Sequence, residues 1–176
     1  AYRCAILPYT ALNRDDPELV ERLIKLGADV NDQSRYDDMK WKIYKPTYST
    51  AAHIAAQSGK IKTLEVLIKY GANLNLKNIT DATPLDVFLY NTDTVSPDVA
   101  KMLVNAGGDV ALSPNGQSKA LGYAIYKKAW PAVAEVLKNT KATITKFNMD
   151  SIVKGACDSG KLDLKAAEAV FYGLKH

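Results

Sequence analysis

The chain has 176 residues, of which 47% are hydrophobic and 24% charged, as is usual for a globular protein that buries a core. Its formal net charge of +4 is modest. No run of about 18 apolar residues occurs, so we expect no helix that spans a membrane.

Two helices are predicted in residues 1–31. The first falls somewhere within residues 2–12, with Pro8 an awkward residue inside it. The second has a strong start, because Asp16 can cap it and Pro17 suits its first turn. Apolar residues at helical spacing follow and are expected to be buried: Leu19, Val20, Leu23, Ile24 and Leu26.

Residues 32–48 form a long segment rich in aromatic and basic residues. The alternation of lysine with Trp, Ile and Tyr in residues 40–45 predicts a lengthened β-hairpin with one apolar face. Its aromatic residues either pack on neighbouring helices as a local core or form a partner-binding arm, since Trp, Tyr and Arg are enriched at binding hot spots. A nucleic-acid partner is not expected, because four Lys or Arg residues against three Asp residues leave a net charge of +1.

Residues 49–75 contain the clearest helix pair. Thr50 suits the N-cap of a first helix, and Gly59 can end that helix because glycine adopts positive φ without steric cost. A second helix is predicted over residues 61–70, ended by Gly71. Its apolar stripe is Ile61, Leu64, Val66, Leu67 and Ile68. Helices this short need neighbours, because isolated helices below roughly 12 residues are marginal in water.

A similar pair recurs in residues 76–111. Thr83 and Pro84 open its first helix with a cap and a proline in the first turn. A longer turn at residues 91–96 follows, and Ser96 is expected to cap the second helix, which begins at Pro97.

Two more divergent pairs are predicted in residues 112–139 and 140–176. In the first of them, a turn at residues 113–116 precedes one helix, and Trp130 opens the next. Trp130 aligns with Ile61 and is therefore expected in the core rather than at a contact surface.

The helix pairs share a closing pattern. It reads Gly-Ala-Asn-Leu-Asn at residues 71–75, Gly-Ala-Asp-Val-Asn at residues 27–31 and Gly-Gly-Asp-Val-Ala at residues 107–111. With the Thr-Pro-Leu-Asp start at residues 83–86 and the Ala-Ala pair at residues 51–52, it resembles the ankyrin repeat. The glycine spacings of 44 and 36 residues exceed the family period of about 33 residues.

The resemblance implies an all-α solenoid of stacked helix-turn-helix units with projecting β-hairpin loops, one of them unusually long at residues 32–48. We expect a single domain over residues 1–176, with degenerate end repeats that face solvent on one side. The predicted repeats are residues 1–31, 49–75, 76–111, 112–139 and 140–176, with the insertion at residues 32–48.

The resemblance also assigns a role to His53, whose imidazole is expected to bond loop backbone between repeats rather than act in catalysis. Asp86 stands where the family has this histidine, which puts the corresponding hydrogen bond in the third repeat in doubt. Gly122 stands at the same place in the fourth.

Few residues suggest chemistry. Cys4 and Cys157 fall in the first and last repeats, too far apart in a stack for a disulfide, so both are expected to be reduced. Two cysteines and two histidines give no metal-ligand spacing, and we expect neither metal nor cofactor. Without paired carboxylates, an activated nucleophile or a Gly-rich phosphate loop, the chain is not expected to be an enzyme.

The given sequence begins at Ala1 without methionine, so the cellular location of the protein stays open, with the cytoplasm as the default and export as an alternative.

An ankyrin-like stack implies a concave binding face made of loop tips and the first helix of each repeat. By register this face would also expose Ser58, Thr80 and Asn91. Tyr and Trp side chains suit a protein surface better than a small substrate. The predicted partner-binding residues are Arg35, Tyr36, Met39, Trp41, Tyr44, Tyr48, Gln57, Lys77, Ile79, Tyr90, Tyr126 and Lys127.

We therefore expect a non-catalytic module that binds one specific protein partner through the concave face and the long loop, and that is monomeric alone. The alternative is a small inhibitor, immunity or effector protein that blocks an enzyme or toxin by binding it. No nucleic acid, membrane insertion or small-molecule substrate is expected.

The charges are unevenly spread along the chain. Residues 1–38 carry five Arg or Lys against eight Asp or Glu, a net charge of −3, and residues 119–176 carry ten Lys against five acids, a net charge of +5. This gradient either orients a complementary partner or reflects lysines that serve solubility.

Overall fold

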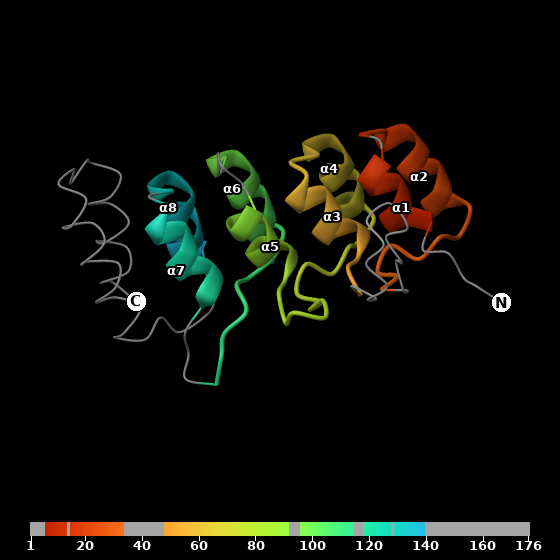
Figure 1. Cartoon of the computed structure of the whole chain (residues 1–176). Helices are drawn as coiled ribbons and strands as arrows, with labels where there is room; N and C mark the ends of the chain where they lie inside the picture. Colours follow the sequence, from red (N-terminus) through yellow and green to blue (C-terminus); the bar gives the residue numbers. More distant parts are fainter. Residues whose placement is uncertain are drawn as a thin grey trace.

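The computed structural model describes residues 6–13, 15–33, 48–91, 96–114, 118–127 and 129–139, and these residues contain eight helices and no strand. The helices are α1 (Ile6–Asn13), α2 (Pro17–Lys25), α3 (Ala51–Gln57), α4 (Ile61–Lys69), α5 (Pro84–Asn91), α6 (Pro97–Asn105), α7 (Lys119–Tyr126) and α8 (Trp130–Asn139). Consecutive helices pair, and the pairs stand side by side in chain order (Figure 1).

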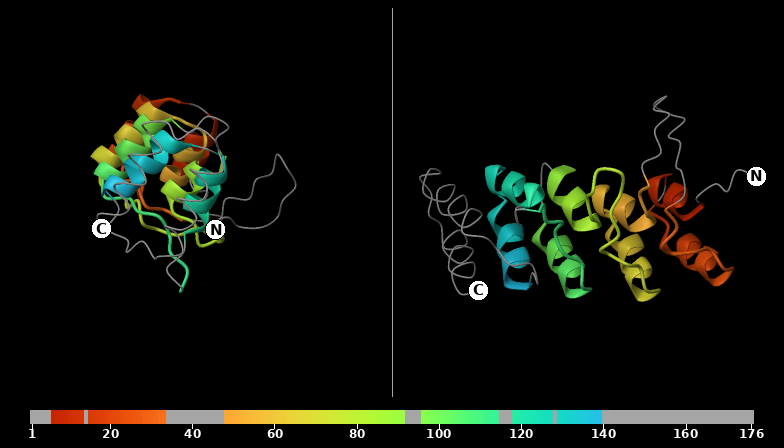
Figure 2. Two further views of the ribbon diagram at one scale, coloured as in Figure 1. Left: turned by 90° about the vertical axis from the view of Figure 1, so that its left-hand side faces the viewer. Right: turned by 90° about the horizontal axis from the view of Figure 1, so that it is seen from below.

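The helices form two rows, seen most clearly from below in Figure 2. The inner row consists of the first helix of each pair, and within it α1 contacts α3, α3 contacts α5, and α5 contacts α7. The outer row consists of the second helices, where α2 contacts α4 and α6 contacts α8. The predicted all-α solenoid of stacked helix-turn-helix units is confirmed.

A single apolar core runs along the stack between the two rows. The described residues of α3 and α5 are buried almost throughout, and burial against neighbours supplies the stability that helices of seven to ten residues lack alone. The largest fully buried apolar side chains are Leu7, Leu64, Leu67, Leu85, Phe88, Leu89, Leu103, Leu137, Val20 and Val133.

Several helix ends lie where the sequence predicts them. The Asp16 carboxylate accepts a hydrogen bond from Leu19 N at 3.0 Å and caps α2. Gly59 and Gly71 have φ angles of 64° and 82°, in the region that favours glycine. Pro8 occupies the first turn of α1, where a backbone N–H has no intrahelical acceptor, so it does not interrupt the helix.

Side-chain amides connect successive pairs at the closing pattern. Asn31 Oδ1 accepts a hydrogen bond from Asn73 N at 2.7 Å, and Asn75 Oδ1 accepts one from Asp109 N at 2.9 Å. Asn75 also donates through Nδ2 to Gly107 O at 2.8 Å. The asparagines that end the first two patterns, Asn31 and Asn75, therefore fix the position of the next pair.

Three predictions about side chains were wrong. Leu26 is 76% exposed, because it lies past the last residue of α2, where helical spacing no longer places it on the core side. Ile61 is 41% exposed because it is the first residue of α4, at the end of its apolar stripe. Ser96 has the extended backbone of an N-cap, but its side chain makes no capping hydrogen bond. Trp130 is only 5% exposed, as predicted, although Ile61, with which it aligns, is not buried.

Other predictions lie outside the described residues. They concern most of the insertion, at residues 34–47, the turn at residues 92–95, the last predicted repeat at residues 140–176, and the two cysteines, Cys4 and Cys157.

Candidate protein-binding surface

The candidate site is the inner face, which we define as Gln57 at the end of α3, Tyr90 on α5, the exposed side of α7 and the loop at residues 76–83. The structure describes seven of the twelve predicted partner-binding residues, and Arg35, Tyr36, Met39, Trp41 and Tyr44 lie outside the described residues. Six of the seven are exposed: Tyr48, Gln57, Lys77, Ile79, Tyr126 and Lys127. Tyr48 is 38% exposed, and Tyr90 is only partly exposed because it also packs on the core.

The loop at residues 76–83 presents Ile79 at its tip. Asn78 organises this loop, since its Oδ1 accepts hydrogen bonds from Thr80 N at 2.9 Å and from Ala82 N at 3.1 Å. Backbone bonds from Asn78 N to Ala82 O and from Asp81 N to Asn78 O, both at 3.0 Å, close the turn. These bonds fix a compact turn, and the side chain of Ile79 at its tip is 55% exposed.

The base of the 32–48 insertion is tied to the same loop by Gln33. Its Nε2 donates to Tyr48 O at 3.1 Å and to Lys77 O at 2.8 Å. Tyr48 has a φ of 50°, which is uncommon for a residue with a side chain and marks local strain. The sequence gives no signal for Gln33, because a glutamine in a loop belongs to no periodic pattern.

His53 links the second and third repeats, as predicted. Its Nδ1 accepts a hydrogen bond from Thr50 N at 3.1 Å, and its Nε2 lies 3.0 Å from Ala82 O. The carbonyl at Ala82 requires a proton on Nε2, so the ring fits this site as the neutral tautomer. Burial accordingly lowers the pKa of His53, against the opposing effect of backbone hydrogen bonds.

Asp86 makes the equivalent connection with the opposite polarity. Its Oδ2 accepts hydrogen bonds from Thr83 N and from Ala111 N in the next loop, both at 2.9 Å. An inter-repeat hydrogen bond therefore does form at Asp86, contrary to the doubt raised by the sequence. The next loop offers a backbone N–H at this position, whereas the loop next to His53 offers a carbonyl. The other oxygen, Oδ1, is buried and accepts no hydrogen bond from the described residues. Burial raises the pKa of Asp86, more than its hydrogen bonds lower it.

Three tyrosines form a cluster on α5 and α7. The ring of Tyr123 lies with its centroid 5.7 Å from that of Tyr90 and 6.3 Å from that of Tyr126. Both distances are in the range of favourable tilted aromatic pairs. The Nζ atom of Lys127 lies 5.7 Å from the Tyr123 centroid, within cation–π range. Tyr123 was missing from the predicted site, although its helical spacing of three from Tyr126 could have indicated it.

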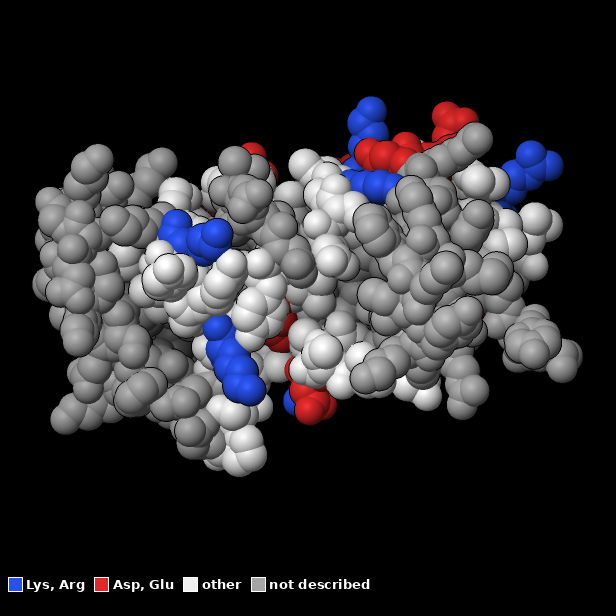
Figure 3. All heavy atoms as spheres, viewed as in Figure 1, with Lys and Arg blue, Asp and Glu red and all other residues white. Residues whose placement is uncertain are grey.

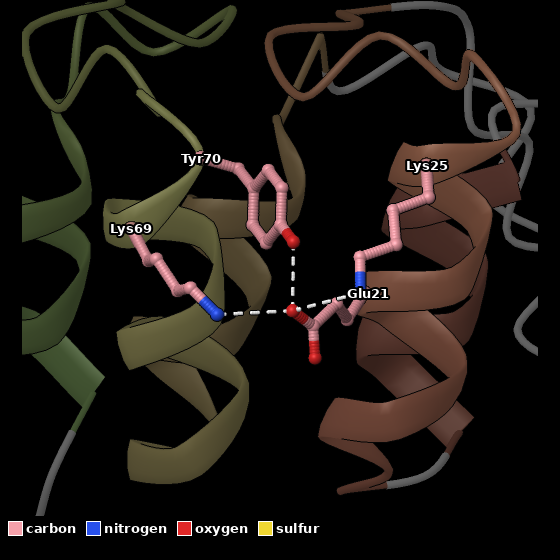
Figure 4. A network of polar contacts seen from close by, with 4 residues as sticks. All are labelled: Glu21, Lys25, Lys69 and Tyr70. Atoms are coloured by element: carbon pink, nitrogen blue, oxygen red, sulfur yellow. Dashed lines mark hydrogen bonds and ion pairs between the residues drawn. The ribbon is translucent and has the colours of Figure 1, made fainter.

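The outer row carries a polar network between α2 and α4 (Figure 4). One oxygen of Glu21 on α2, Oε1, accepts from Tyr70 Oη at 2.7 Å and from Lys69 Nζ at 3.0 Å. Lys25 lies 3.4 Å from the same oxygen. The hydrogen bond from Tyr70, then that from Lys69, lowers the pKa of Glu21 to about 2. These contacts join two repeats through their solvent side.

The charged surface differs between the two ends of the view in Figure 3. Lysine or arginine side chains lie over α7 beside uncharged surface, whereas acidic side chains over α2 and α4 are mixed with lysine or arginine side chains. An open cavity of about 270 Å³ lies on the outer row, between α6 and α8. Acidic and basic side chains balance in its lining, which includes Asp98, Lys101, Glu135 and Lys138.

Features of other site classes are absent from the described part of the chain. It contains no group of three or more His, Cys, Asp or Glu residues arranged to hold a metal ion. None of its helices combines the length and apolar character needed to cross a bilayer.

Comparison with known proteins agrees with this architecture. A family model for ankyrin repeats (3 copies) matches residues 7–114. One putative ankyrin repeat protein of fowlpox virus (strain NVSL) is 29% identical over 94 residues, covering 53% of this chain and 12% of that protein. Another from the same virus is 32% identical over 77 residues, covering 44% of this chain and 23% of that protein.

A mammalian relative is similar over a shorter stretch. Protein phosphatase 1 regulatory subunit 27 of Mus musculus is 33% identical over 64 residues, covering 36% of this chain and 40% of that protein. The chain thus spans less than half the length of each of these relatives. Ankyrin repeats generally mediate protein–protein interaction and are typically non-catalytic. The match to the family model, which covers more than half of the chain, together with the stacked helix pairs, shows that this chain belongs to the ankyrin repeat family.

Proposed function

We propose that this chain is a non-catalytic interaction module that binds one specific protein partner through its inner face and its long loop at residues 32–48. The observation that carries the proposal is the tyrosine cluster, in which Tyr126 is 78% exposed beside Tyr123. Tyrosine is a frequent hot-spot residue, since it offers a large contact area with few rotatable bonds.

The cluster is held in place before any partner binds. Tyr90 packs against the core and against Tyr123, and Tyr123 in turn contacts Tyr126. A side chain that is already ordered loses less conformational entropy on binding. Ile79 adds a second exposed apolar group on the neighbouring loop.

A regulatory role is the second candidate: the chain blocks or directs an enzyme, as an inhibitor, immunity or effector protein does. Its support is the relative from Mus musculus, whose name describes a regulatory subunit of a protein phosphatase. This candidate differs from the first only in what binding does to the partner.

Comparative affinity capture tests the proposal. The full chain, Tyr126→Ala, a deletion of residues 35–45 and the outer-row variant Lys62→Glu are immobilised at equal density and exposed to lysate of the native source. Quantitative mass spectrometry should find one protein that the full chain and Lys62→Glu retain and that the other two lose at least tenfold. If no protein shows this pattern, the inner face and the loop are not its binding surface.

The deletion also separates the two interpretations of the insertion. A partner-binding arm can be removed with little change in the thermal unfolding midpoint, whereas a local core would cost a large part of the stability. The captured protein, if it is an enzyme, is then assayed with and without the chain, and inhibition would favour the regulatory candidate.

A further inference from the structure

One side of α7 is unlike the rest of the inner row. Five residues at helical spacings of three and four share this side, which we name the α7 stripe. The α7 stripe consists of Lys119, Gly122, Tyr123, Tyr126 and Lys127. All five are exposed except Tyr123, which is half-buried. The opposite side of the helix is buried and consists of Ala120, Leu121, Ala124 and Ile125.

Gly122 is the unexpected residue of the stripe. Glycine inside a helix costs about 1 kcal/mol relative to alanine. Gly122 is not among the glycines with positive φ, and a Cβ atom at this position would meet no described atom within 4 Å. Neither the backbone nor the packing of the described residues therefore requires glycine. A glycine does allow the backbone of another molecule to approach a helix closely.

Aromatic rings border the open position at Gly122. Tyr123 follows it in sequence and lies between the rings of Tyr90 and Tyr126. Tyr126 lies four residues after Gly122 on the same side of the helix, so a chain that lies on the helix at Gly122 can place side chains against the rings of Tyr123 and Tyr126.

The charge of the stripe is uniformly positive. Residues 110–134 contain three lysines and no Asp or Glu. Two of these lysines, Lys119 and Lys127, are exposed at the two ends of the stripe, separated by about 12 Å of helix. The basic side chains over α7 in Figure 3 lie apart from the acidic side chains over α2 and α4.

We propose that the α7 stripe binds an extended acidic segment of the partner protein, whose main chain lies against Gly122 and whose carboxylates pair with Lys119 and Lys127. An extended chain rises about 3.3 Å per residue, so two carboxylates about four residues apart match the two lysines. The residues between them contact the rings of Tyr123 and Tyr126. This inference rests on the proposed function and specifies the chemistry of the partner.

Peptide selection on the full chain tests the inference directly. A random library of twelve-residue peptides displayed on phage is selected against the full chain. The consensus peptide is then synthesised with a fluorescent label and titrated by anisotropy. We expect a consensus with two acidic residues about four positions apart, and an affinity that falls as salt is raised.

Substitutions in the stripe provide the decisive comparison. Lys119→Glu and Lys127→Glu should each weaken peptide binding at least tenfold, whereas the matched charge reversal Lys62→Glu on α4 should leave it unchanged. Gly122→Ala should raise the unfolding midpoint, because alanine is the better helix former, and yet weaken binding at least tenfold. Opposite changes in stability and affinity cannot come from loss of the fold.

Several results would overturn the inference. They are a consensus that is basic or neutral, no enrichment of any peptide, unchanged affinity in Gly122→Ala, or an equal loss in Lys62→Glu. Peptides that bind through Ile79, lost in Ile79→Asp but kept in the α7 variants, would overturn this inference and leave the proposed function intact. The proposed function fails separately, in the affinity capture described above.

Discussion

The packing of α4 gives the sharpest test of the fold, because two residues of one predicted stripe lie in opposite environments. Leu67 is 0% exposed, while Ile61 on the same helix is 41% exposed. Leu67→Ala removes three buried carbon atoms, a transfer loss of about 2.4 kcal/mol at roughly 0.8 kcal/mol per methylene. The cavity left between the rows adds to this, so we expect a total loss of about 2–5 kcal/mol.

Ile61→Ala is the matched control, and it should cost less than about 1.5 kcal/mol because its side chain is already partly in water. Urea unfolding followed by circular dichroism measures both values. For a chain of this size, a loss of 3 kcal/mol corresponds to a fall of about 6–12 °C in the unfolding midpoint. Equal losses in the two variants, or a neutral Leu67→Ala, would refute the register of α4 against the core.

Three further predictions concern ionisable groups. Because burial lowers the pKa of His53 below its usual 6.5, its contribution to stability is full above pH 6.5 and is lost as the pH falls through the folded pKa. His53→Gln should cost about 1–3 kcal/mol at pH 8 by denaturant unfolding and flatten this slope, with peptide affinity unchanged; lost affinity at full stability would contradict a structural role. The pKa of Asp86 is raised above 3.8, so its contribution to stability is fully present below pH 3.8 and is lost as the pH rises through the folded pKa. Asp86→Asn keeps an acceptor for Ala111 N and should remove this dependence; an unchanged pH profile of unfolding would show that Asp86 does not titrate there. Glu21 has a pKa lowered from 4.5 to about 2, so the stability it contributes is present above pH 4.5 and is lost as the pH falls to 2. Glu21→Gln should make acid unfolding shallower in that interval, and the same curve as the unaltered chain would exclude the network as a contributor.

Much of the inner face could be predicted from sequence, because register along a repeat fixes which positions face outward. Gln57, Tyr126 and Lys127 were found in this way, and each is exposed. Gln33 was missed because its contacts follow no local pattern, and Tyr123 was missed although its spacing from Tyr126 could have placed it on the same side of the helix. Gln33 bonds Lys77 O across 44 residues of sequence, and Tyr123 contacts Tyr90 across the boundary between two repeats.

The amino-acid sequence alone determined the order of the described helices and several of their caps, because these depend on interactions between residues a few positions apart. Asp16, Thr50, Gly59 and Gly71 act within one turn of chain, so their type predicts their place. The tertiary structure decided how the third repeat connects to the fourth. Asp86 put the usual inter-repeat hydrogen bond in doubt, but its carboxylate accepts a hydrogen bond from Ala111 N of the next loop, at the place where His53 meets a carbonyl. The exposure of Gly122 and Tyr126 on α7 also depends on the tertiary structure, because the neighbouring helices of the stack decide which side of α7 is covered.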